Sequence, residues 1–332
     1  MPMVTFKRVV LPGPEEKMHI AYIEPFRRAW DRMKIALFNP FNLNKWFTIG
    51  FCAFLAGLLD GYHGGSGGSN SNRGRIGSFG EFLDFPNRAW DWLSDNPEWL
   101  IVITAGLVFI IALIITVTWL SSRGTFMFLD NVIQNKAEIA KPWKEYKTEG
   151  NSLYLWRLGF GVVCVMMLIV LTVVFFTIAT QLYADSYDSQ IPIPLIVGMG
   201  LLFLLLIITL AYISLFLKEF VAPIMYKHRI TATQAWGRFL PVLKAHPFHF
   251  IFYGIFIFFI TFVVVIGIIL AAVMTCCVGF VLLVIPYIGT VATLPAWYTF
   301  RAFSLEFLAQ FGDDFDVFPS PAEPSPRNVP AQ

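Results

Sequence analysis

Residues 100–120 read LIVITAGLVFIIALIITVTWL, a run that contains no charged side chain. An α-helix rises about 1.5 Å per residue, so about 20 apolar residues cross the ~30 Å hydrocarbon layer of a bilayer. Within that layer a helix satisfies its own backbone N–H and C=O groups. The run therefore predicts a membrane-spanning helix, and the rest of the chain is interpreted around it.

Three further runs have the same length and character, at residues 158–182, 194–217 and 250–273. None of them holds an Asp, Glu, Lys, Arg or His. Two weaker regions, 40–59 and 286–308, complete a prediction of six spans. The expected fold class is an all-α, polytopic transmembrane bundle with amphipathic interfacial helices on its cytoplasmic side.

The first span has to be extended upstream before it is long enough to cross. Its purely apolar part, residues 46–59, is too short. Asn39 followed by Pro40 fits a helix N-cap followed by proline at the first helical position, where a missing N–H costs nothing. A helix that starts there covers 40–59.

The last apolar region allows two interpretations because it contains Pro286 and Pro295. Either one kinked helix runs through it, or residues 273–285 form a short interfacial piece and the span starts with Pro286 in its first turn. We favour the second interpretation, because Pro286–Gly289 interrupts the apolar run. The span then reaches about Leu308, with Arg301 extending to the inner headgroups.

The distribution of positive charge tests this topology. With the N-terminus inside, six spans leave all but three of the 24 Lys and Arg residues on the inner side, the exceptions being Arg73, Arg75 and Arg88. Such a bias follows the positive-inside rule, and without the first span the N-terminal cations would lie on the wrong side. We expect a multi-pass protein of the cytoplasmic (inner) membrane with both termini in the cytoplasm.

Composition supports this class and excludes others. Hydrophobic residues make up 57% and charged residues 14% of the chain, whereas soluble domains are nearer a quarter charged. The near-neutral charge gives no nucleic-acid footprint, and four Cys make no disulfide or zinc framework. We expect a cytosolic segment at 1–19, a membrane domain at 20–311 with a Gly/Ser-rich outer loop at 61–80, and a disordered cytosolic tail at 312–332.

Three of the cytoplasmic segments resemble one another. Asp130 and Pro223 each lie thirteen residues before a tryptophan, at Trp143 and Trp236, and Ala-Trp leads to an Asn-Pro-Phe or His-Pro-Phe sequence in the first and third segments. The pattern predicts a repeated unit made of an amphipathic helix in the inner interface, a turn and a transmembrane hairpin.

Residues 20–38 show this amphipathic character most clearly, with Tyr22, Phe26, Met33 and Leu37 on one helical face. We expect that face to lie at the acyl boundary while basic residues meet anionic headgroups of the cytoplasmic leaflet. An equally consistent alternative is that such helices only cap the bundle. The candidate lipid-contact residues are Arg27, Arg28, Trp30, Lys34, Trp143, Trp236 and Arg238.

Motifs for catalysis or metal binding are weak. Gly64–Gly68 matches the nucleophile pattern G-x-S-x-G, but its low-complexity surroundings favour a linker. His246 and His249 lack the further ligands that zinc requires, and adjacent Cys276 and Cys277 could form only a strained disulfide. We expect no cofactor and no metal.

Paired carboxylates of the kind used in hydrolysis are also absent. Glu219, Glu306 and Asp130 lie near Lys218, Arg301 and Arg123, and boundary ion pairs explain them. Proton and ion pathways usually need ionisable residues deep in the membrane, and the six spans carry none there. This argues against a proton-coupled transporter.

Several short segments together resemble a poorly characterised bacterial six-span family, related to the membrane domain fused to some glycerophosphodiester phosphodiesterases. These segments are Ser122–Gly124, Leu129–Asn131, Phe220–Met225, Ala235–Trp236, His246–Pro247, Pro286–Thr290 and Phe300–Leu305. The resemblance covers most of residues 20–311 and implies the six-span fold but no established activity. No stretch is long enough to hold a phosphodiesterase catalytic domain.

We therefore expect a non-enzymatic envelope scaffold, lipid-associated module or subunit of a membrane assembly, with membrane lipids and other membrane proteins as partners and no nucleic acid. One alternative is a channel or transporter for a neutral or lipidic solute, with a polar crevice at the Pro286–Pro295 break. Another is a membrane enzyme of lipid metabolism, whose only plausible set is Asp130, Arg123, His246 and Glu306.

Overall fold

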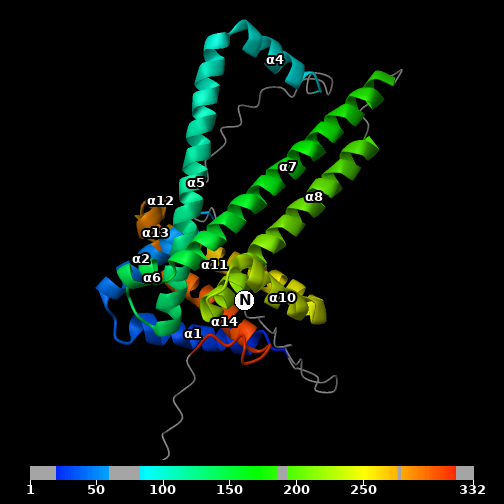
Figure 1. Ribbon diagram of the computed structural model, residues 1–332. Helices are drawn as coiled ribbons and strands as arrows, with labels where there is room; N and C mark the ends of the chain where they lie inside the picture. The colour runs from blue at the N-terminus through cyan, green and yellow to red at the C-terminus, as the bar shows by residue number, and fades with distance from the viewer. Residues whose placement is uncertain (1–19, 60–82, 186–192, 276–277, 319–332) are drawn as a thin grey trace, which may run out of the picture.

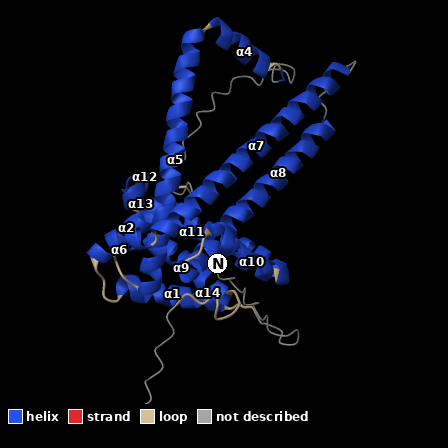
Figure 2. Cartoon of the chain, in the orientation of Figure 1, coloured by secondary structure: helices blue, strands red, loops and turns tan. Residues whose placement is uncertain are grey.

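The computed structural model describes residues 20–59, 83–185, 193–275 and 278–318, and every regular element in these ranges is a helix (Figures 1 and 2). Long helices extend from one end of the molecule, where shorter helices pack around their bases. The expected all-α class is confirmed.

Four of these helices are long and apolar enough to cross a membrane. They are α5 (Pro97–Gln134), α7 (Lys147–Asp185), α8 (Ile193–Phe216) and α11 (Pro247–Met274). The third continues from α8 through the π-helical turn η1 (Leu217–Val221) into α9 (Ala222–His228). They contain the predicted spans 100–120, 158–182, 194–217 and 250–273.

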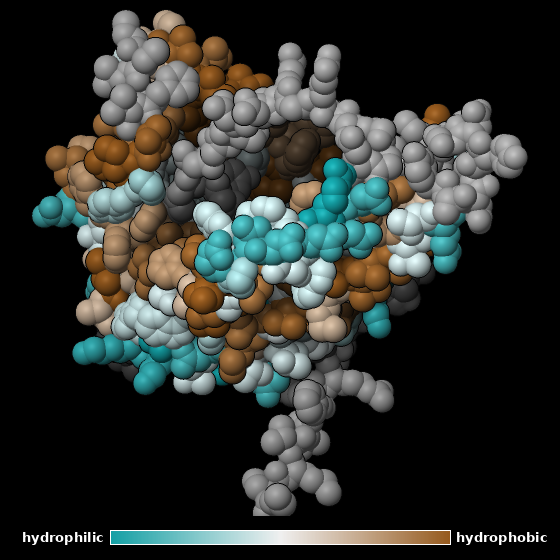
Figure 3. Space-filling model, turned by 90° about the horizontal axis from the view of Figure 1, so that it is seen from above, coloured by the Kyte–Doolittle hydropathy of each residue, from teal (hydrophilic) through white to brown (hydrophobic). Residues whose placement is uncertain are grey.

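The apolar stretches of these helices expose most of their side chains. In α5, Phe109 is 70% exposed, and in α11 Phe258 is 66% exposed. In Figure 1, α5 rises apart from α7 and α8, which run side by side. Figure 3 shows hydrophobic residues on the surface when the molecule is viewed from above. Exposed apolar surface of this kind suits contact with lipid better than contact with water.

The tertiary core lies at the bases of the long helices. In α5 every residue from Ser121 to Ile133 is buried. The final helix, α14 (Leu294–Ala309), passes through this core and buries Tyr298, Phe303 and Phe307. Side-chain packing is therefore concentrated where the apolar stretches end.

The helix α1 (Ile23–Phe38) lies across this packed end, against α14. Its aromatic face contacts protein: the Tyr22 ring stacks on Phe307, and Phe26 meets Phe303 edge-on. The expectation that this face lies at the acyl boundary is wrong, because the apolar surface of α14 packs against it. The alternative role, capping the bundle, describes α1.

The first predicted span is shorter than expected. The helix α2 (Leu43–Gly57) begins three residues after Pro40, and the Asn42 side chain, not Asn39, accepts the capping hydrogen bond from the Lys45 N–H. Its 15 residues correspond to about 22 Å of helix. One face of α2 packs against α5, where Ala56 O accepts a hydrogen bond from Ser121.

The last predicted span, 286–308, is two helices instead of one. Pro286 opens α13 (Pro286–Ala292) in its first turn, as expected, but this helix ends at Ala292, and α14 begins at Leu294. Preceding it, α12 (Val278–Val284) is a separate short helix, which agrees with the favoured interpretation of a break before Pro286. The second break arises because Pro295, in the first turn of α14, cannot donate a backbone hydrogen bond to α13.

The proposed repeat is visible in the succession of helices. Both α5 and α9 end at a residue in the left-handed conformation, Asn135 (φ 54°) and Arg229 (φ 53°). A short helix follows each of them, α6 (Ala140–Glu145) or α10 (Ala232–Ala245), and a long apolar helix follows that. In the first, N-terminal copy, α1 leads instead to the short α2.

The start of the predicted tail packs onto the helices. Phe315 is buried, the Lys227 ammonium donates to the carbonyls of Asp313 and Asp316, and the Arg32 guanidinium lies 3.6 Å from the centre of the Phe318 ring. The folded part therefore extends to residue 318 instead of ending at 311. The predicted segment 1–19, the loop 61–80 with its G-x-S-x-G match, the pair Cys276–Cys277 and residues 319–332 lie outside the described residues.

The close contact of α2 with α5 is testable at Gly124. A Cβ there would lie 2.5 Å from Leu55 Cβ and 2.7 Å from the Ala56 nitrogen, so Gly124→Val should force the helices apart and lower stability by about 1–3 kcal/mol. Thermal unfolding in detergent measures this. Gly106→Val, on the same helix but with nothing within 4 Å, is the matched control. Equal melting temperatures for the two variants would contradict the packing described.

Candidate functional site

Buried ionisable side chains gather in the packed end of the molecule. Those that are buried are Arg123, Asp130, Glu149, Glu219, Arg301 and Glu306. A charged side chain that is buried away from water needs ion-pair or hydrogen-bond partners. The partners of these residues therefore show which contacts hold the packed end together. They fall into separate groups.

The first group joins η1 to α14. The Arg301 guanidinium donates a 2.8 Å hydrogen bond to the Lys218 carbonyl and lies 3.6 Å from Glu219 Oε2. The Lys218 ammonium lies 3.8 Å from Glu219 Oε1, so two cations share one carboxylate. Arg301 was expected to extend to the inner headgroups, but its side chain is only 3% exposed, because it is held inside the core by this carbonyl and this carboxylate.

Two polar atoms beside this group have no hydrogen-bond partner among the described residues: Glu219 Oε2 and the Tyr253 hydroxyl. The Tyr253 side chain is fully enclosed by aromatic rings, including Phe220 and Phe307. The π-helical turn η1 places Glu219 here by adding one residue to the helical repeat, a distortion often found at functional positions.

The second group joins α1 to α14. Arg32 donates a short hydrogen bond of 2.5 Å to Glu306 Oε1, and Arg28 lies 3.8 Å from Glu306 Oε2. The sequence placed Glu306 beside Arg301 instead. Arg32 was missed as a partner, although its position next to Met33, at the edge of the buried face of α1, was a signal for it.

The third group surrounds Asp130 on α5. Tyr226 and Gln134 each donate to Asp130 Oδ1 at 2.8 Å, and Tyr146 donates at 3.2 Å. Burial raises the pKa of the Tyr146 hydroxyl, and the Tyr226 hydroxyl and the Asp130 charge raise it further, so this phenol stays protonated and donates. Asp130 was expected to pair with Arg123, but tyrosines hold it.

Arg123 lies in a separate place, beside two indole rings. Its guanidinium is 5.1 Å from the ring centres of both Trp119 and Trp143, and it donates to the Asn151 side chain at 3.0 Å. Such cation–π contacts stabilise a charge that is largely out of water. The set proposed for an enzyme is therefore not gathered: Arg123, Asp130 and Glu306 belong to different groups, and the His246 ring contacts His249 and Phe311.

The candidate lipid-contact residues divide into two classes. Trp143 and Trp236 pack within the protein, against Trp119 and against Trp156. The others are exposed, namely Arg27, Arg28, Trp30, Lys34 and Arg238. Arg28 pairs with Glu24 and Lys34 with Asp31, whereas Arg27 and Arg238 have no carboxylate within 4.0 Å among the described residues.

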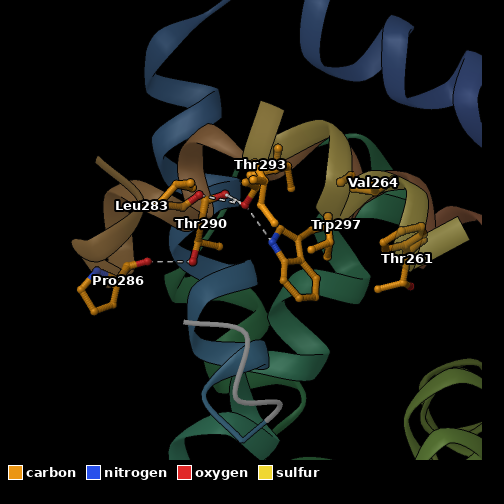
Figure 4. A pocket seen from close by; sticks show the side chains of 13 residues that line it. Thr261, Val264, Leu283, Pro286, Thr290, Thr293 and Trp297 are labelled. Carbon is orange, nitrogen blue, oxygen red and sulfur yellow. Dashed lines mark hydrogen bonds between the residues drawn. The ribbon is translucent and has the colours of Figure 1, made fainter. Parts of the chain in front are cut away.

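A cavity of about 200 Å³ lies between α11 and the segment α12–α14, at the break between Pro286 and Pro295 (Figure 4). One wall is a single face of α11, formed by Thr261, Val264, Val265, Ile268 and Ile269. The facing wall includes Leu283, Thr290, Thr293 and Trp297.

The polar side chains on the α12–α14 wall of the cavity are engaged in hydrogen bonds. Thr290 donates to the Pro286 carbonyl at 2.9 Å, and Thr293 donates to the Gly289 carbonyl at 2.8 Å. The Trp297 indole N–H donates to Thr293 Oγ1 at 3.1 Å, as the dashed line in Figure 4 shows. Apart from Thr261 on α11, the remaining lining is apolar, so the cavity suits a hydrocarbon chain better than a hydrated solute.

Neither metal binding nor thiol chemistry finds support in the part of the chain that the structure describes. No group of three His, Cys, Asp or Glu in these ranges could hold a metal ion. Cys52 is buried in the core, its sulfur accepting a hydrogen bond from Asn131, and Cys164 lies on a predicted span.

A double-mutant cycle tests the pair Glu219–Arg301. Arg301→Gln and Glu219→Gln should each destabilise the protein by about 3–5 kcal/mol. The first leaves the buried Glu219 with only the Lys218 ammonium at 3.8 Å, and the second leaves the buried Arg301 without its carboxylate. The double variant should be more stable than the sum of the two losses predicts, by more than 1 kcal/mol. Unfolding in mixed micelles provides the free energies. Strictly additive losses would show that the two side chains do not interact.

Comparisons with known proteins add a family but no activity. No curated protein matches the chain, and no solved structure matches it. A family of unknown function, DUF7544, matches residues 21–317, which corresponds closely to the folded range that ends at residue 318. The chain therefore belongs to this family of unknown function, DUF7544.

Proposed function

We infer that the chain crosses the bilayer six times. The helix α1 packs on α14 at the base of α5, whereas α4 (Phe85–Asp95) lies at the other end of this 38-residue helix, which is about 57 Å long. The chain between α1 and α4 must therefore travel from one end to the other. The segment from the end of α11 to the end of α14 must likewise run back to the packed end.

The orientation follows from charge. The packed end holds most of the Lys and Arg residues of the described chain, including Arg27, Lys34, Lys227 and Arg238. The positive-inside rule then places this end, and both termini, in the cytoplasm. Together with the bacterial six-span resemblance, this supports a location in the cytoplasmic (inner) membrane.

Within that membrane the protein acts as a non-enzymatic, lipid-associated module whose cytoplasmic face contacts anionic headgroups. The observation that carries this proposal is the exposed set Arg27, Trp30, Lys34 and Arg238 on the packed end, beside apolar helices that expose their side chains. Cations next to an anionic leaflet contribute about 1 kcal/mol each. The ionisable groups considered for catalysis are instead used in structural contacts.

A transporter for a lipidic solute is the second candidate. It is favoured by one observation, the cavity at the Pro286–Pro295 break, although a polar crevice was expected there and this cavity is lined mostly by apolar side chains. Its apolar lining argues against a polar solute. Flux of a fluorescent lipid analogue across proteoliposomes would separate a carrier from a module that only binds.

The lipid-associated role predicts a preference for anionic over zwitterionic lipid around the protein. Spin-labelled phosphatidylglycerol should associate more strongly than spin-labelled phosphatidylcholine, and the preference should weaken with salt because exposed charges are screened. The triple variant Arg27→Gln, Lys34→Gln, Arg238→Gln should lose most of the preference. Each cation removed should lower the relative association constant for the anionic lipid by up to about fivefold.

The control removes a cation from the other end of α5, in α4: Arg88→Gln should keep the preference. An unchanged ratio of the two lipids in the triple variant, or an equal loss in the control, would refute the assignment of headgroup contact to the packed end.

A further inference from the structure

The cavity between α11 and α12–α14 is open toward the surroundings of the helices. Two of its α11 residues, Val265 and Ile269, are 39% and 47% exposed. They belong to a helix that is long and apolar enough to cross the membrane. In the six-span arrangement proposed above, the opening faces acyl chains. Its lining over Thr261–Ile269 spans about 12 Å of helix, which suits one chain lying along α11.

Apolar contact alone cannot make this cavity selective. A lipid chain leaving the bilayer exchanges one hydrocarbon environment for another, so the hydrophobic effect contributes little within the membrane. Any specific occupant must therefore be recognised at its polar end, and the polar surroundings of the cavity decide what that occupant is.

Trp297 connects the cavity to a cationic group. Its ring lines the cavity, and the Lys218 ammonium lies 5.7 Å from the centre of that ring. Arg301, one turn further along α14 than Trp297, shares Glu219 with Lys218. Both cations lie within 4.0 Å of the Glu219 carboxylate. The Arg301 side chain is 3% exposed and that of Lys218 is 23% exposed, so Lys218 is the cation that a ligand can reach.

We propose that the cavity holds one acyl chain of an anionic phospholipid whose phosphate lies against Lys218, with Trp297 at the boundary between chain and headgroup. A long lysine side chain at the end of a span reaches headgroups while its stem stays in apolar surroundings. Indole rings are favoured at the same depth. This site deepens the proposed lipid association and rests on it, but it differs from the exposed residues of α1 and α10.

The test uses the full-length protein, delipidated and then incubated with phosphatidylglycerol that carries a photoreactive group on its acyl chain. Cross-linked peptides identified by mass spectrometry should contain residues 261–269 or 293–300. Phosphatidylcholine with the same chains should label these peptides at least tenfold less. Equal labelling by the two lipids, or labelling elsewhere only, would overturn the proposal.

Two variant pairs define the site. Ala296→Phe fills the cavity, and Lys218→Gln removes the reachable cation; each should reduce this labelling at least tenfold. Ala292→Phe, beside the cavity but not lining it, and Lys244→Gln, exposed on α10, are the matched controls and should keep it. Retained labelling in Ala296→Phe would also overturn the proposal.

The spin-label preference separates this site from the general role. The cavity variants should leave that preference unchanged, because it depends on Arg27, Lys34 and Arg238. Loss of cross-linking selectivity with an intact spin-label preference would remove the cavity site alone. Loss of the spin-label preference in the native protein would remove the general role.

Discussion

The fold depends on one constraint: a bilayer is as apolar as the side chains that face it. Apolar helices therefore gain little by packing on each other in the membrane, and their arrangement must be fixed by other contacts. In this protein those contacts lie where the apolar stretches end. Ser121–Ile133 of α5, η1 and α14 pack there around buried aromatic rings. The exposed upper parts of α5, α7 and α8 follow from the same constraint.

Buried charge gives this packed end its specificity. Arg301 with Glu219, Arg32 with Glu306, and Asp130 with its tyrosines each join helices that are far apart in sequence. A buried carboxylate without its partner costs several kcal/mol, so alternative registers of α14 against α1 and η1 are disfavoured. These ionisable side chains are already engaged in structural contacts, which explains the structure better than it supports a catalytic role.

The sequence predicts the parts of this structure that depend on local properties. Uncharged runs such as 100–120 give the four long helices, and Pro286 gives the start of α13. The sequence does not predict whether lipid or protein covers the apolar face of an amphipathic helix. The aromatic side of α1 suits lipid and protein equally well, and only the position of α14 decides between them.

Ion pairs between residues far apart in the sequence could not be predicted either. Glu306 and Arg32 are 274 residues apart, and no spacing rule joins them. From the sequence, the Pro286–Pro295 break was the expected position for a polar crevice, because prolines interrupt a helix there. The mostly apolar lining of the cavity at this break could not be predicted from the sequence. One of its walls comes from α11 and depends on how that helix packs.

Topology is the central claim and can be measured directly. In a variant whose four native cysteines are replaced by alanine, Ser71→Cys in the Gly/Ser-rich stretch and Ser320→Cys in the proline-rich end are treated with a membrane-impermeant maleimide on intact cells. We predict labelling at position 71 before lysis and at position 320 only after lysis. Labelling of both positions before lysis, or of neither, would contradict six crossings with a cytoplasmic packed end.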